Sequence, residues 1–130
     1  MEQIKLFNHK LIRFALVGTG GLIIDFSITW IFKEIFFLQP LYANAIGFCI
    51  AVVSNYSFNK IWTFQSETKN ILNQFFKFLA ISMIGLFLNT SILWSLQYLN
   101  NMRFYFNKGL ATALVVLWNY FANSRITFKK

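Results

Sequence analysis

The sequence predicts an all-α, polytopic membrane protein with four transmembrane helices as two parallel two-helix repeats, forming a single domain over residues 1–130. Three observations support this fold class. The chain is 57% apolar and only 12% charged, where a typical soluble domain has about 25% charged residues. Its few charges leave long uncharged runs between them, and the sequence repeats itself at a fixed offset.

Four segments are long enough to cross a bilayer as helices. A hydrocarbon core of about 30 Å needs roughly 20 mostly apolar residues. Residues 14–32 contain only the charge of Asp25, and residues 35–59, 78–102 and 109–124 contain no charge. We therefore predict spans near residues 12–33, 41–62, 76–99 and 105–126. The first run is too long for a signal peptide and lacks an obvious cleavage site, so we expect it to be retained.

The basic residues sort to one side of the predicted membrane. Four spans place both termini and the central loop on the same face, which then holds Lys5, Lys10, Arg13, Lys60, Lys69, Lys77, Arg125, Lys129 and Lys130, against Lys33, Arg103 and Lys108 on the other. Basic residues favour the cytoplasmic side of membrane proteins. We therefore expect cytoplasmic N- and C-termini, and the net charge of +8 needs no nucleic-acid partner.

Residues 13–64 align with residues 77–128 without a gap. The matched pairs include Phe14 with Phe78, Gly21 with Gly85, Trp30 with Trp94, Asn55-Tyr56 with Asn119-Tyr120, Asn59 with Asn123, and Thr63-Phe64 with Thr127-Phe128. Each repeat half would cross the membrane twice and return to its starting side. Both halves then share one orientation, related by a pseudo-two-fold axis along the membrane normal.

Each predicted helix carries one polar or small-residue stripe, which we expect to face the bundle interior because hydrocarbon cannot satisfy amide or carboxyl groups. The asparagines of these stripes are Asn44, Asn55, Asn59, Asn89, Asn119 and Asn123. They are candidates for binding a polar substrate. The alternative is that they form structural hydrogen bonds between helices.

Asp25 is the only acidic residue at the predicted membrane depth. An ionisable group inside a membrane is costly and is a functional candidate for that reason. It fits a proton carrier, an ion-pair partner or an acceptor for sugar hydroxyls. The alternative is a neutral side chain that is hydrogen-bonded to a neighbouring helix. Its repeat mate, Asn89, cannot titrate.

Four cations flank the cytoplasmic ends of the predicted helices: Arg13, Lys60, Lys77 and Arg125. Together they would form a ring at headgroup level that suits a lipid phosphate, since Arg binds phosphate through a bidentate fork and Lys as a point charge. The same residues also satisfy the positive-inside rule. Both interpretations remain open at this point.

The sequence contains no arrangement typical of a catalytic or metal site. Its single histidine and single cysteine offer no triad and no ligand cluster with metal spacing, and no phosphate-binding glycine loop follows a strand. We therefore expect no enzyme activity, no catalytic residue, no bound metal and no cofactor.

Three motifs resemble the GtrA-like family: Arg13-Phe14-x-x-Val17-Gly18, Asn55-Tyr56-x-x-Asn59-Lys60-x-Trp62-Thr63-Phe64 and Asn119-Tyr120-x-x-Asn123-x-Arg125-x-Thr127-Phe128. The resemblance covers about residues 10–130. It implies a four-helix protein of the bacterial inner membrane in cell-surface polysaccharide and teichoic-acid glycosylation. Its implied role is to move a polyprenyl-phosphate-linked monosaccharide, such as undecaprenyl-phosphate-glucose, to the outer leaflet. Arg125 is shifted by one position relative to Lys60, which turns a helix face by about 100°.

This resemblance suggests a mechanism without covalent chemistry. The cytoplasmic cations would bind the lipid phosphate, the asparagines and Asp25 would contact the sugar, and Lys108, with Arg103, would receive the phosphate on the far side. The polyprenyl tail would stay among the membrane lipids, against the Phe-rich surface. Because four helices alone enclose a path poorly, a homodimer or a partner glycosyltransferase would complete it.

Two alternatives remain. The first is a small proton-coupled multidrug exporter, which fits the position of Asp25 but not a basic ring around a cationic substrate. The second is a non-transporting membrane anchor or regulatory subunit of a glycosyltransferase.

Overall fold

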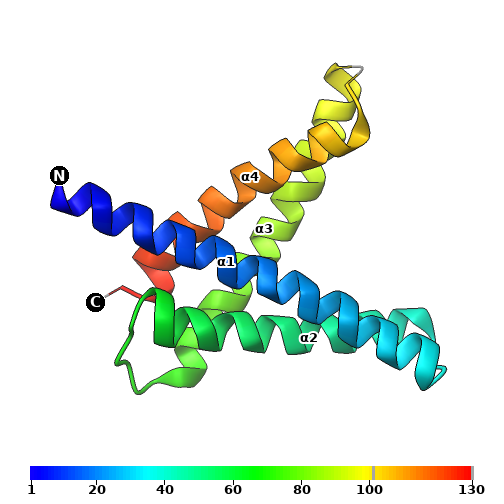
Figure 1. Cartoon of the computed structure of the whole chain (residues 1–130), viewed down its shortest axis with the longest axis horizontal. Coiled ribbons are helices and arrows are strands. Elements are labelled where there is room, and N and C mark those ends of the chain that lie inside the picture. Colours follow the sequence, from blue (N-terminus) through cyan, green and yellow to red (C-terminus); the bar gives the residue numbers. More distant parts are fainter. Residues whose placement is uncertain (101, 130) are drawn as a thin grey trace. The chain divides into compact units, whose positions relative to one another are not determined.

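The computed structural model describes residues 1–100 and 102–129 and is all-helical throughout that part (Figure 1). Helix makes up 87% of the structure. The helices are α1 (Glu2–Trp30), α2 (Pro40–Phe58), α3 (Ile71–Leu99) and α4 (Phe104–Ala122), with π-helical turns η1 (Ile31–Ile35), η2 (Asn59–Thr63) and η3 (Asn123–Thr127). This confirms the predicted all-α class. Lys130, one of the predicted cytoplasmic cations, lies outside the described residues.

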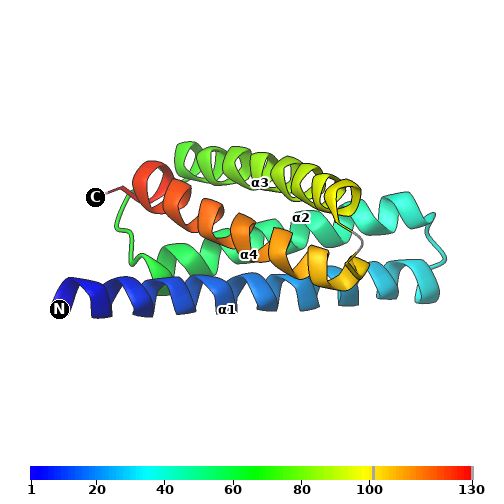
Figure 2. The same cartoon turned by 90° about the horizontal axis from the view of Figure 1, so that it is seen from above.

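The chain forms two compact units, Met1–Glu67 and Thr68–Lys130, and each is a helical hairpin. Figure 2 shows α1 beside α2 and α3 beside α4. α2 and α4 have 19 residues each, and both continue into a π-helical turn of 5 residues. Their ends fall on positions that the sequence repeat makes equivalent. The repeat read from sequence is thus also a repeat of structure.

The helix ends follow from local chemistry. α2 begins with Pro40, whose fixed φ and missing N–H suit the first helical position. α3 is capped by the side chain of Asn70, whose oxygen accepts from the Asn73 N–H at 3.4 Å. The π-helical turns η1 and η2 are each followed within two residues by a left-handed residue, Phe37 (φ 56°) and Gln65 (φ 49°), and this conformation often terminates helices.

Three helical segments are long and apolar enough to cross a membrane: Glu2–Ile35, Pro40–Thr63 and Ile71–Leu99. Large apolar side chains such as Phe26 (74% exposed) and Trp94 (71% exposed) lie on their outer surfaces, as expected for lipid contact. The protein is therefore a polytopic membrane protein. α4 matches α2 in length, but Asn107 and Lys108 near its start lower its hydropathy. The fourth span stays a prediction.

Small residues bring the helices of each hairpin close together. Ala43, Gly47 and Ala51 are buried along α2, as expected for a small-residue track that allows close backbone approach. In the first unit, the Asn55 side chain packs directly over Gly21 of α1, at a spot where a Cβ atom would overlap it.

The second unit repeats this packing. The Asn119 side chain covers Gly85 of α3, and a Cβ atom there would lie 3.0 Å from Asn119 Nδ2. At the end of each hairpin that contains the chain termini and the central loop, two phenylalanine rings meet edge to face. Phe14 and Phe64 have centroids 6.2 Å apart in the first unit, and Phe78 and Phe128 are also 6.2 Å apart in the second. These aromatic contacts hold the residue that follows each π-helical turn against the first helix of its hairpin, α1 or α3.

Candidate functional site

Arg13 is fixed at the end of the first hairpin, where η2 meets α1. Its Nη1 donates to the backbone oxygen of Trp62 at 3.1 Å, and its guanidinium carbon lies 5.4 Å from the centroid of the Trp62 ring. A π-helical turn leaves carbonyl groups unpaired, and the guanidinium satisfies one of them. Arg13 therefore presents a positive charge beside an aromatic ring of the kind that concentrates at membrane interfaces.

The second unit has a related bond from a different residue to a different backbone oxygen, that of Thr127, which aligns with Thr63 and not with Trp62. Here Gln74, one helical turn before Lys77, donates through its Nε2 to the backbone oxygen of Thr127 at 3.2 Å, and this bond is buried. Lys77, the repeat mate of Arg13, is exposed and forms no hydrogen bond or ion pair with the described residues. The two halves thus differ at this position: the first cation is bound to the backbone and the second is available.

Lys77 lines a polar pocket of about 310 Å³ at this end of the second unit. The side chains around it include Asn70, Asn73, Gln74, Thr127 and Lys129. Two ammonium groups together with amide and hydroxyl groups supply donors for a phosphate and both donors and acceptors for sugar hydroxyls. Of the residues predicted to bind a phosphorylated headgroup, Lys77 lines this pocket, and the other residues around it were not among the candidates.

Asn59 and Asn123 belong to the π-helical turns. The Thr63 hydroxyl donates to Asn59 Oδ1 at 2.8 Å, and the Thr127 hydroxyl donates to Asn123 Oδ1 at 2.8 Å. Asn123 Nδ2 also donates to the backbone oxygen of Asn119 at 2.8 Å. Both asparagine side chains are buried and engaged in local hydrogen bonds. These contacts match the alternative in which such asparagines are structural.

Asn119 differs from these two asparagines. Its side-chain oxygen Oδ1 is buried and has no hydrogen-bond partner among the described residues. An unpaired buried acceptor is costly, and native structures rarely keep one without a reason. The oxygen is suited to accept a hydrogen bond from a hydroxyl group that reaches it.

Asp25 lies half-buried between α1 and α2. The Thr29 hydroxyl donates to Asp25 Oδ1 at 3.3 Å, and both residues face Gly47. A Cβ atom at Gly47 would overlap the Thr29 hydroxyl and lie 2.7 Å from the Asp25 backbone oxygen. At the equivalent contact the second unit has Ala111, facing a helix that carries Asn89 in place of Asp25. Gly47 therefore makes room for the Asp25–Thr29 pair.

The remaining candidates are dispersed. Asn44 and Lys108 are exposed, and Asn89 is half-buried. Asn44 was expected to face inward, but the buried face of α2 is the neighbouring track of Ala43, Gly47 and Ala51, which leaves Asn44 about a quarter-turn away. Its inward placement is not observed in the hairpin.

The four cations of the predicted ring are divided between the two units. Arg13 and Lys60 lie in the first unit, and Lys77 and Arg125 lie in the second. The Arg125 guanidinium lies 5.8 Å from the centroid of the Phe121 ring, and Arg125 does not line the pocket of Lys77. The ring itself stays a prediction.

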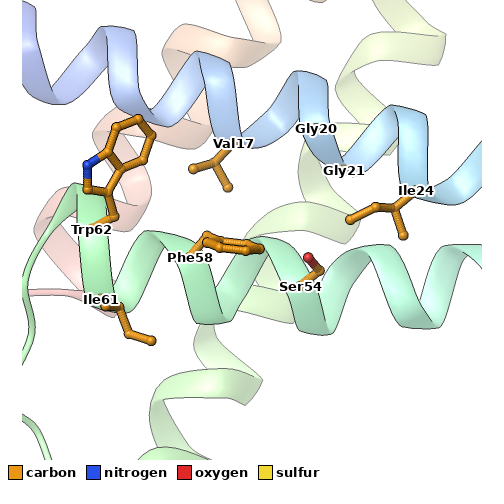
Figure 3. A pocket seen from close by; sticks show the side chains of 8 residues that line it. All are labelled: Val17, Gly20, Gly21, Ile24, Ser54, Phe58, Ile61 and Trp62. Carbon is orange, nitrogen blue, oxygen red and sulfur yellow. The ribbon is translucent and has the colours of Figure 1, made fainter.

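An apolar groove of about 530 Å³ opens between α1 and α2 (Figure 3). One wall consists of α1 residues around Gly20 and Gly21, and the other consists of Ser54, Phe58 and Trp62. In Figure 3 the groove runs from Trp62, the residue that holds Arg13, to Ile24. The apolar groove therefore begins beside the fixed guanidinium of Arg13.

Several of these residues were not among the sequence candidates. Gln74 aligns with Lys10, so the repeat gave no hint of its buried bond to Thr127. Asn107 is fully buried and donates to Asn100 Oδ1 at 3.0 Å, but it aligns with Ala43. The Asn-x-x-x-Thr spacing in both halves is the sequence signal that accompanies the π-helical turns.

Hairpin repeats with interfacial cations and interior polar groups define a class of small polytopic membrane proteins. Residues 13–128 match the family model described as GtrA/DPMS, transmembrane domain. The chain belongs to this family, as its motifs predicted. The family consists of membrane proteins connected with glycosylation. No curated protein matches the chain by sequence.

Proposed function

We propose that this protein translocates a polyprenyl-phosphate-linked monosaccharide across the bacterial inner membrane, for glycosylation of cell-surface polysaccharide. The observation that carries the proposal is the polar pocket of the second unit. It joins the available cation Lys77 to amide and hydroxyl groups, at the end of a hairpin whose outer surface is apolar. A lipid with an anionic, hydroxyl-rich headgroup matches that combination.

The first step in this proposal is capture of the headgroup on the cytoplasmic side. Lys77 and Lys129 attract the phosphate, and Asn70 and Asn73 bond the sugar hydroxyls. Arg13 offers a second positive charge at the equivalent end of the first hairpin, where the Trp62 ring supports it. Mixed sites of this kind favour a phosphorylated sugar over a bare phosphate, because each hydroxyl adds hydrogen bonds.

The second step is passage of the sugar through the membrane. Asn119 supports this step because its buried oxygen has no partner among the described residues and can accept from a sugar hydroxyl. Asp25 offers further acceptors in the first hairpin, beside Thr29. On the far side, Lys108 is exposed and would receive the phosphate. Every step exchanges hydrogen bonds, and we propose no covalent reaction and no enzyme activity.

The proposal places both termini in the cytoplasm, in accord with the basic residues at that end of both hairpins. The carrier lipid would be exchanged with a glycosyltransferase on the outer side. A homodimer would supply the additional helices that a sealed path for the sugar requires.

The test is transport by the purified protein in liposomes. Labelled undecaprenyl-phosphate-glucose is placed in both leaflets, and a membrane-impermeant oxidant that cleaves sugar diols is added outside. We expect the oxidant to consume the whole pool of sugar lipid with wild-type protein and only the outer-leaflet pool in protein-free liposomes. Consumption that stops at the outer-leaflet pool with wild-type protein would overturn the proposal.

A further inference from the structure

The residues that line the groove between α1 and α2 are not repeated at the equivalent positions of the second half. Its opening depends on Gly20 and Ser54, which project little or no side chain into it. At the repeat-equivalent positions the second half has Ile84 and Trp118. Side chains of this size at those two positions would fill the volume that Gly20 and Ser54 leave open, so the internal duplication has diverged at this site.

The walls of the groove differ between the halves as well. Phe58 and Trp62 form an aromatic wall in the first half, and their equivalents are Ala122 and Ile126. No Cβ contact explains Gly20, because a Cβ atom there would meet nothing within 4 Å. Helix packing therefore does not require a glycine at this position. An open groove does.

The groove also has a polar end. Trp62 lines it and at the same time holds Arg13, through its backbone oxygen at 3.1 Å and its ring at 5.4 Å. An occupant that extends along the groove from Trp62 toward Ile24 would therefore place its head beside a guanidinium and its chain on an apolar surface. This charge complementarity selects a lipid with an anionic head.

We infer that this groove binds the isoprenoid chain of a polyprenyl phosphate, with its phosphate at Arg13, and that Gly20 and Ser54 determine this binding. The inference rests on the proposed function for the identity of the lipid, and it gives the phosphate of the sugar-free polyprenyl phosphate a position at Arg13, in addition to the headgroup pocket of Lys77. It assigns chain binding to the first hairpin alone, which makes the two halves unequal in their roles. The branched, unsaturated chain packs against the aromatic rings of Phe58 and Trp62.

The experiment measures binding separately from transport. Purified full-length protein in lipid nanodiscs is photolysed with a polyprenyl phosphate that carries a diazirine within its isoprenoid chain and no sugar. The adducts are mapped by mass spectrometry. We expect adducts on residues 17–24 and 54–62, and competition by unlabelled polyprenyl phosphate but not by phosphatidylglycerol.

Gly20→Ile and Ser54→Trp place the residues of the second half into the groove and should lower the adduct yield roughly tenfold. Gly18→Ile is the matched control, because Gly18 lies on the same helix, also meets nothing within 4 Å of its Cβ, and does not line the groove. It should keep the wild-type yield. Circular dichroism and gel filtration of all three variants check that each is folded.

The inference would be overturned by adducts outside the groove, by equal loss in Gly18→Ile and Gly20→Ile, or by equal competition by phosphatidylglycerol. Cross-links from the groove to a second copy would assign it to a dimer interface and also overturn it. The transport assay separates the two proposals. If the groove is labelled but no transport occurs, the inference of chain binding stands and the proposed translocation is wrong. If transport occurs but Gly20→Ile leaves the adduct yield unchanged, only the inference about the groove is wrong.

Discussion

The Thr63 hydroxyl donates a hydrogen bond to the Asn59 side-chain oxygen across 2.8 Å inside the π-helical turn η2, and Thr127 repeats this bond with Asn123. All four residues are buried. π-helical turns are rare and often occur at functional sites. Here they displace the last carbonyl groups of each hairpin, and Arg13 and Gln74 then bind the oxygens of Trp62 and Thr127. The turns therefore organise the last part of each hairpin.

Thr63→Val should destabilise the first hairpin by about 1–3 kcal/mol, because it leaves a buried amide oxygen without its donor. Thermal unfolding in detergent, followed by circular dichroism, measures the effect. Thr19→Val is the matched control, since the Thr19 hydroxyl is exposed and donates only to Ala15 within its own helix. Equal melting temperatures for both variants would contradict the role given to the Asn59–Thr63 bond.

Gly21→Ala and Gly85→Ala should each destabilise the protein by about 1–3 kcal/mol, because the added methyl group overlaps the Asn55 or Asn119 side chain. Gly18→Ala and Gly109→Ala serve as controls, since their Cβ atoms would meet nothing within 4 Å. These controls should be neutral or slightly stabilising, as alanine favours helices. Thermal unfolding in detergent, followed by circular dichroism, measures the stability of all four variants. Destabilisation of all four variants to one extent would argue against the close helix contact.

Gly47→Ala should destabilise the first hairpin and displace Asp25, because the methyl group meets the Thr29 hydroxyl and Asp25. Adding Thr29→Ala should restore part of the stability, since it removes one of the two obstacles. The double-mutant comparison measures this coupling. Strict additivity of the two changes would show that Gly47 and Thr29 do not interact.

Asn119→Leu should keep or raise the stability while abolishing transport. Leucine has a similar size and removes a buried oxygen that has no partner among the described residues, so no hydrogen bond is lost. Asn123→Leu is the comparison, because it breaks two local bonds and should lower stability. Melting temperature and liposome transport are measured together. Wild-type transport by a stable Asn119→Leu variant would remove Asn119 from the proposed path.

Lys77→Gln should weaken binding of undecaprenyl-phosphate-glucose in detergent micelles roughly fivefold, the effect of about 1 kcal/mol at an exposed charge. The loss should shrink at high salt, because mobile ions screen exposed charges. Lys5→Gln makes the same charge change in an exposed position of the first unit, away from the pocket. Tryptophan fluorescence titration provides the measurement. An equal loss in both variants would mean that net charge, and not the pocket, attracts the lipid.

The sequence predicted the helices and the repeat well because both depend on patterns that a single chain displays. Uncharged runs such as residues 35–59 are long and apolar enough to contain a membrane-spanning helix. The matched Gly21–Gly85 and Asn55–Asn119 pairs proved to be the same interhelical contact in both hairpins. Identity at an offset of 64 residues was therefore evidence of shared packing.

The site was less predictable, because several of its features depend on differences between the halves. Arg13 and Lys77 align, but Arg13 bonds to a backbone oxygen, whereas Lys77 forms no hydrogen bond or ion pair with the described residues. Helical periodicity selected Asn44 for the interior, but close packing favours the smaller Ala43 on that face. The groove at Gly20 arises from a missing side chain, which a search for polar residues does not detect.

Selective transport in liposomes tests the central claim most directly. Labelled undecaprenyl-phosphate-glucose and a fluorescent phosphatidylglycerol are incorporated together with the wild-type protein, and the accessibility of each to impermeant reagents is followed over time. We predict that the sugar lipid crosses and that the phosphatidylglycerol does not, because the glucose ring offers more hydroxyl donors to Asn119 and Asp25 than the glycerol headgroup does, and only the sugar lipid has an isoprenoid chain. Movement of neither lipid, or equal movement of both, would contradict the account.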